Sequence, residues 1–259
     1  MAAALKSASE SGTLVLTISN PEHHNALGPE IYVAGVEALN AAENNPDVHS
    51  VILTGEGRIF SAGGQLQRLL KAREGQLDAQ RQAVDSLHSW IDSIRTFPKP
   101  VIAAVEGPAA GAGFALALAC DLIVASEAAF FSMAYAKVGL SPDGGASWHL
   151  ARALPRALAS DALMRGTRLS AQQLAQHGLV NQVAAEGAAL GTALQLAADL
   201  NARAGNVLAS VKELIQHAEL HGLPAHLTEE REHFMRNLVH ANAGEGISAF
   251  LDKREPRFR

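Results

Sequence analysis

The chain has 259 residues, of which 48% are apolar, and a formal net charge of −5 at pH 7. This length supports one substantial hydrophobic core, and the scattered basic residues exclude a typical nucleic-acid-binding protein. The single cysteine, Cys120, excludes an intrachain disulfide and favours a reducing compartment, so we expect a cytoplasmic protein. The first residues lack a signal-peptide core, and the apolar run 107–120 is too short to cross a bilayer.

The first hundred residues alternate between strand and helix patterns. Period-2 alternation of apolar residues indicates strands, and apolar residues three and four apart indicate helices. On this basis we expect strands at 13–19 and 48–54 and helices at 29–44, from 66 to 70, and from about 79 to 97. The polar stretch 21–27 is predicted to be a loop, and the polar stretch 73–80 is predicted to be mobile.

The stretch from Lys99 to Ser126 has the clearest local pattern. A β-branched run, three glycines and an Ala/Leu-rich run follow one another, which predicts a strand, a tight turn and a buried helix. Such a turn leaves backbone N–H groups at a helix N-terminus, where the helix dipole favours negative charge. The glycine turn at 59–64 has a similar pattern. Two donors near Ala62 and Ala112 that point at one position would form an oxyanion hole, although both turns also fit a purely packing role.

After residue 126 the pattern becomes increasingly helical. We expect short strands at 122–125 and 129–132, a loop at 138–145, and short helices of which one is capped by Ser170. Long amphipathic helices are predicted at 187–203, 207–220 and 225–239, and a last segment at 247–258. We therefore divide the chain into an α/β core at 1–200 and a helical region at 201–259 that serves as a cap or an oligomerisation element.

Three segments resemble the signature of the enoyl-CoA hydratase/isomerase (crotonase) superfamily: IFSAGGQLQ at 59–67, PKPVIAAVEGPAAGAGFALALACDLIVAS at 98–126 and FLDKREPRF at 250–258. The likeness covers nearly the whole chain. It implies an α/β fold with a crotonase-like spiral of ββα repeats, a C-terminal helical trimerisation region, and a homo-oligomer that is a trimer or a dimer of trimers. It also implies an acyl-CoA thioester substrate, whose oxygen is held by the N–H groups of Ala62 and Ala112. No separate cofactor is implied, because CoA is part of the substrate.

The residues that match the acid/base positions of this family differ from those of a hydratase. Typical hydratases carry glutamates at the positions that match Ala115 and Tyr135, and neither residue is a carboxylate here. Alanine transfers no proton, and a tyrosine with a pKa of about 10 is a poor base at neutral pH. Several isomerases, including ring-1,2-epoxyphenylacetyl-CoA isomerases, carry a carboxylate that matches Asp143. The resemblance therefore favours a double-bond isomerase that acts through a thioester enolate, with Asp143 as the acid/base.

Other functions remain open at this point. One is hydration at an atypical site, where His88 or Asp143 activates water. Another is hydrolysis like that of 4-chlorobenzoyl-CoA dehalogenases, which carry a histidine that matches His88 and an aspartate that matches Asp143. A third is CoA binding without catalysis. Asp143 also has a plainer reading, because an aspartate before Gly144-Gly145 is a common turn residue.

The resemblance also implies a pocket role for Gly111 and Tyr135. It implies CoA contacts from the first loop, the glycine turn and the closing helix, namely His24, Ala26, Gly63, Gly64, Gln65, Phe250 and Lys253, the last two from the same or a neighbouring subunit. His24 replaces the usual basic residue, so its contact with the CoA phosphates would depend on pH. The histidine pairs 23/24, 217/221 and 226/233 lack a full ligand set, so we expect no metal. We expect no nucleic-acid or membrane partner.

Overall fold

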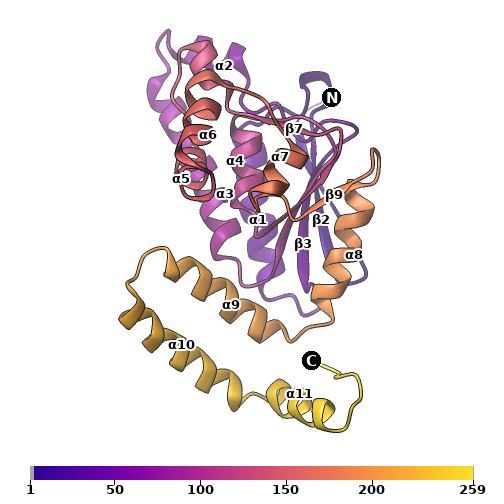
Figure 1. The fold of residues 1–259 in the computed structure, drawn as a ribbon. Helices are drawn as coiled ribbons and strands as arrows, with labels where there is room; N and C mark the ends of the chain where they lie inside the picture. Colours follow the sequence, from indigo (N-terminus) through magenta and orange to yellow (C-terminus); the bar gives the residue numbers. More distant parts are fainter. Residues whose placement is uncertain (1–2, 259) are drawn as a thin grey trace.

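The structure of the chain is a computed structural model that describes residues 3–258. Within these residues, six strands form one sheet and three short strands form another (Figure 1). The larger sheet has the order β1 (Ala4–Glu10), β2 (Thr13–Ser19), β3 (Ser50–Gly55), β4 (Val101–Val105), β6 (Leu122–Ser126) and β9 (Gln182–Ala184). The smaller sheet has the order β5 (Ala109–Ala110), β7 (Phe130–Ser132) and β8 (Leu169–Ser170).

The strands of the larger sheet run parallel from β2 to β9, and only β1 pairs antiparallel, at the edge. The sequence of β4, VIAAV, is buried throughout, which is typical of a parallel strand that helices cover on both faces. Parallel strands place their carboxyl ends at one edge of the sheet. The turns that follow β3 and β4 therefore meet there, and a bridge between Ser61 and Ala109 joins them.

Helices cover both faces of the larger sheet (Figure 1). The main hydrophobic core lies between one face and α1 (Pro29–Glu43), α3 (Leu77–Thr96) and α4 (Ala112–Ala119), while α8 (Ala189–Asn201) packs on the other face. The other helices are α2 (Leu66–Ala72), α5 (Ala146–Ala153), α6 (Arg156–Ser160), α7 (Ala171–Gln176), α9 (Gly205–Ala218), α10 (Leu223–Leu238) and α11 (Ala241–Leu251). Short helical turns are η1 (Pro21–His23), η2 (Ala134–Val138) and the π-helical η3 (Asp161–Arg165). No helix among residues 3–258 combines the length and the apolarity that crossing a bilayer requires.

The predicted mixed α/β fold with a C-terminal helical region is confirmed, and so is the Ser170 cap. The Ser170 hydroxyl accepts a hydrogen bond from the Gln173 N–H, and the Gln173 side chain accepts one from the Ser170 N–H. The sequence pattern did not reveal β1, because this edge strand is largely exposed and polar. The helix expected from about residue 79 begins at Leu77, inside the polar stretch 73–80.

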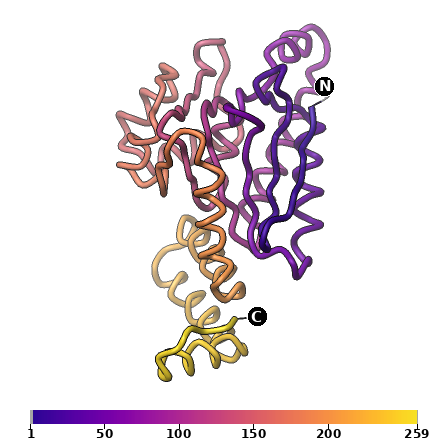
Figure 2. Tube along the Cα trace, turned by 90° about the vertical axis from the view of Figure 1, so that its right-hand side faces the viewer, coloured from indigo at the N-terminus to yellow at the C-terminus, as the bar shows by residue number. Residues whose placement is uncertain are grey.

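The helices α9, α10 and α11 form a C-terminal arm, residues 205–251, which projects from the body of the chain (Figures 1 and 2). The predicted boundary between residues 200 and 201 lies at the end of α8. Polar contacts attach α9 to the body. The Lys212 Nζ donates to Asp121 Oδ2 at 2.8 Å and to the Ile94 carbonyl at 2.9 Å. The Arg95 guanidinium pairs with the Glu219 carboxylate at 3.1 Å.

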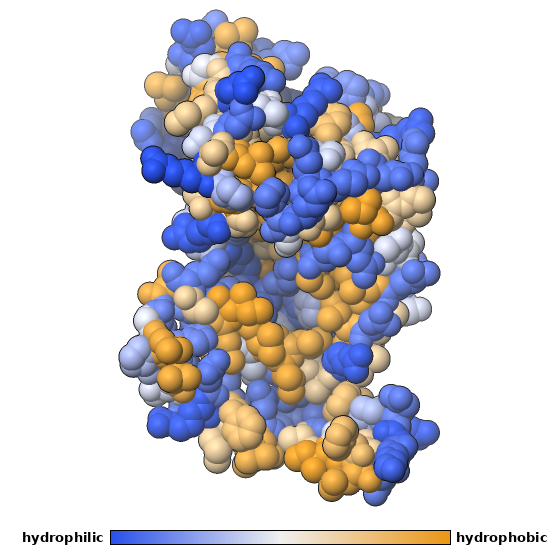
Figure 3. All heavy atoms as spheres, in the orientation of Figure 1, coloured by the Kyte–Doolittle hydropathy of each residue, from blue (hydrophilic) through white to orange (hydrophobic). Residues whose placement is uncertain are grey.

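Large apolar side chains remain exposed along the C-terminal arm, and Figure 3 shows apolar atoms gathered on its surface. They come from all three helices and the connections between them: Val207, Val211, Ile215, Leu220, Leu223, Leu227, Phe234, Met235, Leu238, Val239, Ile247, Phe250 and Leu251. A surface of this kind marks an interaction site more often than a free face in water.

The ion pair between Lys212 and Asp121 gives a test of how the arm is attached. Burial lowers the pKa of the Lys212 ammonium and raises the pKa of the Asp121 carboxyl, so each charge depends on the other. The substitution Lys212→Met leaves the Asp121 carboxylate without its counter-charge. We expect the free energy of unfolding, measured by urea denaturation, to fall by about 3–5 kcal/mol.

Adding Asp121→Asn to Lys212→Met removes the unpaired charge and should recover part of this loss. A loss below about 1 kcal/mol in the single variant, the magnitude of an exposed ion pair, would contradict the role of this contact.

Candidate functional site

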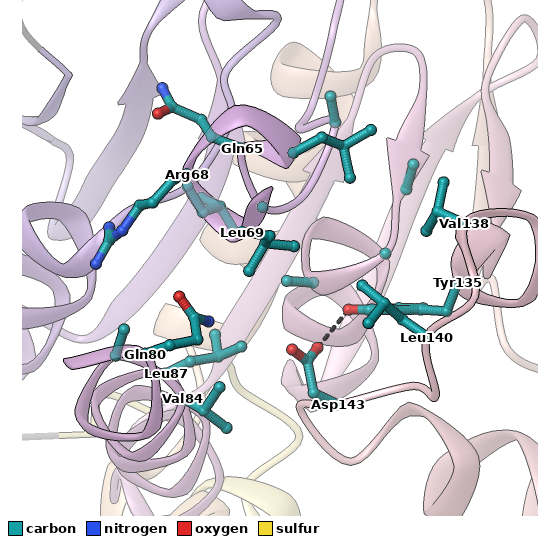
Figure 4. Close-up of a pocket in the computed structure, with 18 of the residues that line it drawn as sticks. Gln65, Arg68, Leu69, Gln80, Val84, Leu87, Tyr135, Val138, Leu140 and Asp143 are labelled. Atoms are coloured by element: carbon teal, nitrogen blue, oxygen red, sulfur yellow. Dashed lines mark hydrogen bonds between the residues drawn. The ribbon is translucent and has the colours of Figure 1, made fainter. Parts of the chain in front are cut away.

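A cavity of about 180 Å³ lies at the edge of the sheet where the turns after β3 and β4 meet. Its lining is mostly apolar, with a few polar side chains, as is typical of small-molecule sites. Figure 4 shows Leu69, Val84 and Leu87 on one side of it and Tyr135 and Asp143 on the other. Among the described residues that line this cavity, Asp143 is the only carboxylate and no histidine or cysteine is present, so the lining offers no set of metal ligands.

The two glycine turns are in direct contact beside this cavity. Gly63 has a φ of +84°, and a Cβ added there would lie 2.7 Å from the Ala110 carbonyl oxygen and 3.1 Å from the Ala112 nitrogen. Gly113 fits equally closely, since an added Cβ would lie 2.6 Å from the Ser61 Cβ. Only glycine allows these approaches. They bring the backbone of the first turn against the N-terminus of α4.

The N–H groups of the first turn are used in a way that the sequence did not reveal. The Ala62 N–H donates to the His24 carbonyl at 3.0 Å, so it is not available to a ligand, and the predicted role of Ala62 as a donor is wrong. The Gly63 N–H donates to the Ser61 Oγ at 3.1 Å. Gly64 lines the cavity, and no hydrogen bond is assigned to its N–H within residues 3–258. The available donor of this turn is therefore the Gly64 N–H.

On the opposite turn, the predicted donor Ala112 lies at the start of α4. Gly111 has a φ of +52°, and its N–H donates to the Ser132 carbonyl at 2.9 Å, which fixes the turn. Ala112 is the first residue of α4 and lines the cavity. No partner is assigned to its N–H in the described part of the chain. The first N–H groups of a helix have no partner within it, so this one is free to bind an anion.

Asp143 and Tyr135 face each other across the loop that follows η2, as Figure 4 shows. The Tyr135 hydroxyl donates a hydrogen bond to Asp143 Oδ1. Burial and then the Asp143 charge raise the pKa of Tyr135 well above its ordinary value, so this hydroxyl stays protonated and acts as a donor. Asp143 is half-buried and reaches the cavity, where a carboxylate can accept a proton.

Tyr32 is a cavity residue that the sequence analysis missed. It lies on α1, is 7% exposed and lines the cavity. Burial and then the Asp143 charge raise its pKa, so it also remains a neutral hydroxyl. Tyr32 precedes Asp143 by more than a hundred residues, and on α1 it continues an ordinary apolar face. Only its proximity to Asp143 in the folded chain distinguishes it from the other apolar positions of α1.

The packing around Ala115 leaves no room for a glutamate side chain at this position. Ala115 is fully buried, does not line the cavity and packs against Gly144 in the loop that carries Asp143. A Cβ added at Gly144 would lie 2.9 Å from the Ala115 Cβ and 3.0 Å from Ile91 Cδ1. The loop occupies the space that a longer side chain at residue 115 would need.

The remaining predicted residues are dispersed. His88 is exposed on α3 and does not line the cavity, so the structure does not bring it together with Asp143. Gln65 lines the cavity. His24 is exposed, and its carbonyl accepts the hydrogen bond from the Ala62 N–H. Ala26 is buried, and its N–H donates to the His23 carbonyl. Phe250 and Lys253 are exposed at the far end of the C-terminal arm, away from α2 and α4 (Figure 1). They do not reach the cavity of their own chain.

The sequence has clear relatives. Residues 8–259 match the family model described as enoyl-CoA hydratase/isomerase. The chain is 36% identical over 250 residues to the 1,2-epoxyphenylacetyl-CoA isomerase of Escherichia coli K12. This alignment covers 96% of this chain and 95% of that protein. It is 34% identical over 246 residues to the 2,3-dehydroadipyl-CoA hydratase of the same organism, with 95% and 94% covered.

The fold also has a close match among solved structures. An enoyl-CoA hydratase from Polaromonas sp. JS666 superposes with a TM-score of 0.97 at 64% identity, covering 98% of this chain and 99% of that chain. The named relatives thus include both an isomerase and hydratases. On the match over residues 8–259 and the shared fold, the chain belongs to the enoyl-CoA hydratase/isomerase family.

Proposed function

We propose that this member of the family is a double-bond isomerase of acyl-CoA thioesters, with Asp143 as its acid/base. The observation that carries the proposal is a single carboxylate in the described lining of a cavity that also holds two unbonded N–H groups, those of Gly64 and Ala112. A 1,3-shift of a double bond needs one group that removes a proton and returns it, and it needs stabilisation of the negative charge in between.

The reaction proceeds in two proton transfers. The thioester oxygen of a 3-enoyl-CoA accepts hydrogen bonds from the Gly64 and Ala112 N–H groups, at the N-terminal end of α4. Asp143 removes a proton from the α-carbon, and the electron pair moves into a dienolate whose charge lies largely on that oxygen. The Asp143 carboxyl then returns the proton to the γ-carbon, which leaves a conjugated 2-enoyl-CoA and a regenerated carboxylate. The reaction neither consumes nor releases water, and it uses no cofactor.

The two tyrosines assist without exchanging protons. Their raised pKa values keep both hydroxyls neutral. Tyr135 holds the Asp143 carboxylate through its hydrogen bond, which limits the rotation of that side chain. Tyr32 closes the apolar wall on the α1 side, where it excludes water from the dienolate.

Hydration is the second candidate, because the relatives at 34% and 64% identity are named as hydratases. In this chain Asp143 would then both activate water and supply the α-proton. The dehalogenase-like alternative loses its basis, since its second residue, His88, lies outside the cavity. A member without catalysis would keep the Gly64 and Ala112 donors and would bind acyl-CoA without turnover.

The first test of the proposal is Asp143→Asn, which keeps the shape of the side chain and removes its basicity. With 3-enoyl-CoA as substrate, kcat for formation of the conjugated thioester should fall by about 10²–10⁴-fold, because a general acid/base contributes that much. The KM should change little, since the N–H donors and the apolar walls are retained.

Crotonyl-CoA serves as the comparison substrate in the same spectrophotometric assay. The unmodified protein should consume its conjugated absorbance far more slowly than it forms conjugated product from 3-enoyl-CoA. Rapid loss of crotonyl-CoA absorbance would support hydration instead. Full isomerase activity in Asp143→Asn would refute the assignment of this residue.

The second test places a hydratase-like carboxylate at residue 115. Ala115→Glu should not create hydratase activity, because Gly144 and Ile91 already fill the space in front of it. Overpacking of this kind costs about 1–3 kcal/mol of stability, and it displaces the loop that carries Asp143, so the isomerase kcat should also fall. Ala115→Gln is the matched control, since it has the same volume without the charge. Hydration of crotonyl-CoA by Ala115→Glu alone would contradict this packing argument.

We also propose that residues 201–259 form an oligomerisation region and that the chain assembles into a trimer or a dimer of trimers. The exposed apolar side chains of the C-terminal arm support this. A contact of Phe250 or Lys253 with CoA would come from a neighbouring subunit, because these residues lie far from the cavity of their own chain (Figure 1). A reducing cytoplasmic environment fits the free, buried Cys120.

The assembly is tested by introducing charge into the arm. Phe234 and Val239 are 65% and 82% exposed in the single chain, and burying one such side chain contributes about 1.5–3 kcal/mol. Light scattering coupled to gel filtration should give a mass of three or six chains for the unmodified protein and of fewer for Phe234→Asp/Val239→Asp. Arg231→Ser, on an exposed polar face of α10, is the control that should leave the mass unchanged. A monomeric unmodified protein would contradict the proposal.

A further inference from the structure

Three potential metal ligands converge on the C-terminal arm, away from the cavity. The His217 Nδ1 lies 2.9 Å from Glu229 Oε2, and the His221 Nδ1 lies 2.7 Å from Glu229 Oε1. All three ligand atoms lie within 4.8 Å of one another. In the sequence alone, the histidine pair 217/221 has no recognisable third ligand. The fold supplies it from α10.

The hairpin of α9 and α10 explains the convergence. His217 lies in the last turn of α9, and His221 follows four residues later in the connection to α10. The N–H of His221 donates to the His217 carbonyl at 3.0 Å, so the helical spacing continues as far as His221. The antiparallel α10 faces them. The same register pairs Ser210 with Asn237 at 2.9 Å, further along the two helices. His217 and Glu229 thus sit on the packed helical pair, and His221 sits on the short connection directly after α9.

The two histidine rings point their Nδ1 atoms at the two oxygens of one carboxylate. Without a metal, each Nδ1 must carry a proton to donate to Glu229. Two imidazoles and one carboxylate are also the ligand set of catalytic zinc sites, which keep an open fourth position. With metal–ligand bonds of about 2.0–2.2 Å, tetrahedral ligands stand about 3.4 Å apart, so the two histidine–carboxylate distances of 2.9 and 2.7 Å need to open by about 0.5 and 0.7 Å.

We propose that His217, His221 and Glu229 form a binding site for a divalent transition-metal ion, with Zn²⁺ as the representative. The ion replaces the two Nδ1 protons and binds both helices of the hairpin. The side chains are 28–39% exposed, so water completes the coordination and the ion exchanges with solvent. Imidazole nitrogens favour Zn²⁺ and its neighbours in the first transition row over Mg²⁺. The bound ion would stiffen the arm whose apolar surface remains to be covered.

The test uses the full chain without a polyhistidine tag, dialysed against EDTA and then against chelator-free buffer. Isothermal titration with ZnCl₂ should give one saturable site per chain, and MgCl₂ should give none. Loss of a ligand should weaken binding by about tenfold or more, since even the loss of an outer-shell partner costs about 10–100-fold. Glu229→Gln is the preferred variant because it keeps the size of the side chain and an oxygen that can accept a hydrogen bond from one histidine.

The matched control is His177→Ala, an exposed histidine on the body that should bind Zn²⁺ like the unmodified protein. His217→Ala should weaken binding to a similar extent as Glu229→Gln, and far-ultraviolet circular dichroism of each variant checks that the helices persist. CoCl₂ should give the visible absorption of a tetrahedral ion in the unmodified protein and not in Glu229→Gln. Absence of saturable Zn²⁺ binding, or equal binding in Glu229→Gln, would overturn the site and leave a pair of histidine–carboxylate hydrogen bonds.

Discussion

The contact between the two glycine turns is the constraint on which the site depends. Gly63 has no side chain, and the space where a Cβ would stand is taken by the Ala110 carbonyl and the Ala112 nitrogen. Parallel pairing of β3 with β4 brings both turns to one edge of the sheet, and the two glycines at residues 63 and 113 let them touch. Ala112 is buried, and an unpaired buried N–H costs about 1–3 kcal/mol, which a ligand that accepts a hydrogen bond there would offset.

The side of the cavity that carries Asp143 depends on a second close contact. The loop from Gly139 to Gly145 has three glycines with positive φ. They allow the loop to pack closely against α4, where Gly144 contacts Ala115. The loop can bring Asp143 to the cavity in this position because the side chain at residue 115 is small.

Much of the fold could be predicted from the sequence, because buried parallel strands and amphipathic helices have clear periods. The site was predicted only in part. The motif identifies the turn at 59–64, but the choice between Ala62 and Gly64 depends on the His24 carbonyl, a partner that lies 38 residues earlier in the chain. The sequence left open a catalytic role for His88, because a one-residue step along α3 separates the cavity wall at Leu87 from the exposed His88. Glu229 could not be assigned to His217 and His221 before the hairpin of α9 and α10 was known.

The C-terminal arm is held to the body of the chain by polar contacts and keeps large apolar side chains exposed. Its contacts with its own body are polar, from Lys212 to Asp121 and from Arg95 to Glu219, and they hold α9 in place without covering its apolar side chains. Polar contacts of this kind give orientation, whereas apolar burial supplies most of the free energy of association. An arm that is oriented by its own body and left apolar elsewhere fits the proposed assembly, because little reorganisation would precede association. Because the cavity is formed by residues before 150, association can change through the arm without changing the geometry of Asp143, Gly64 and Ala112.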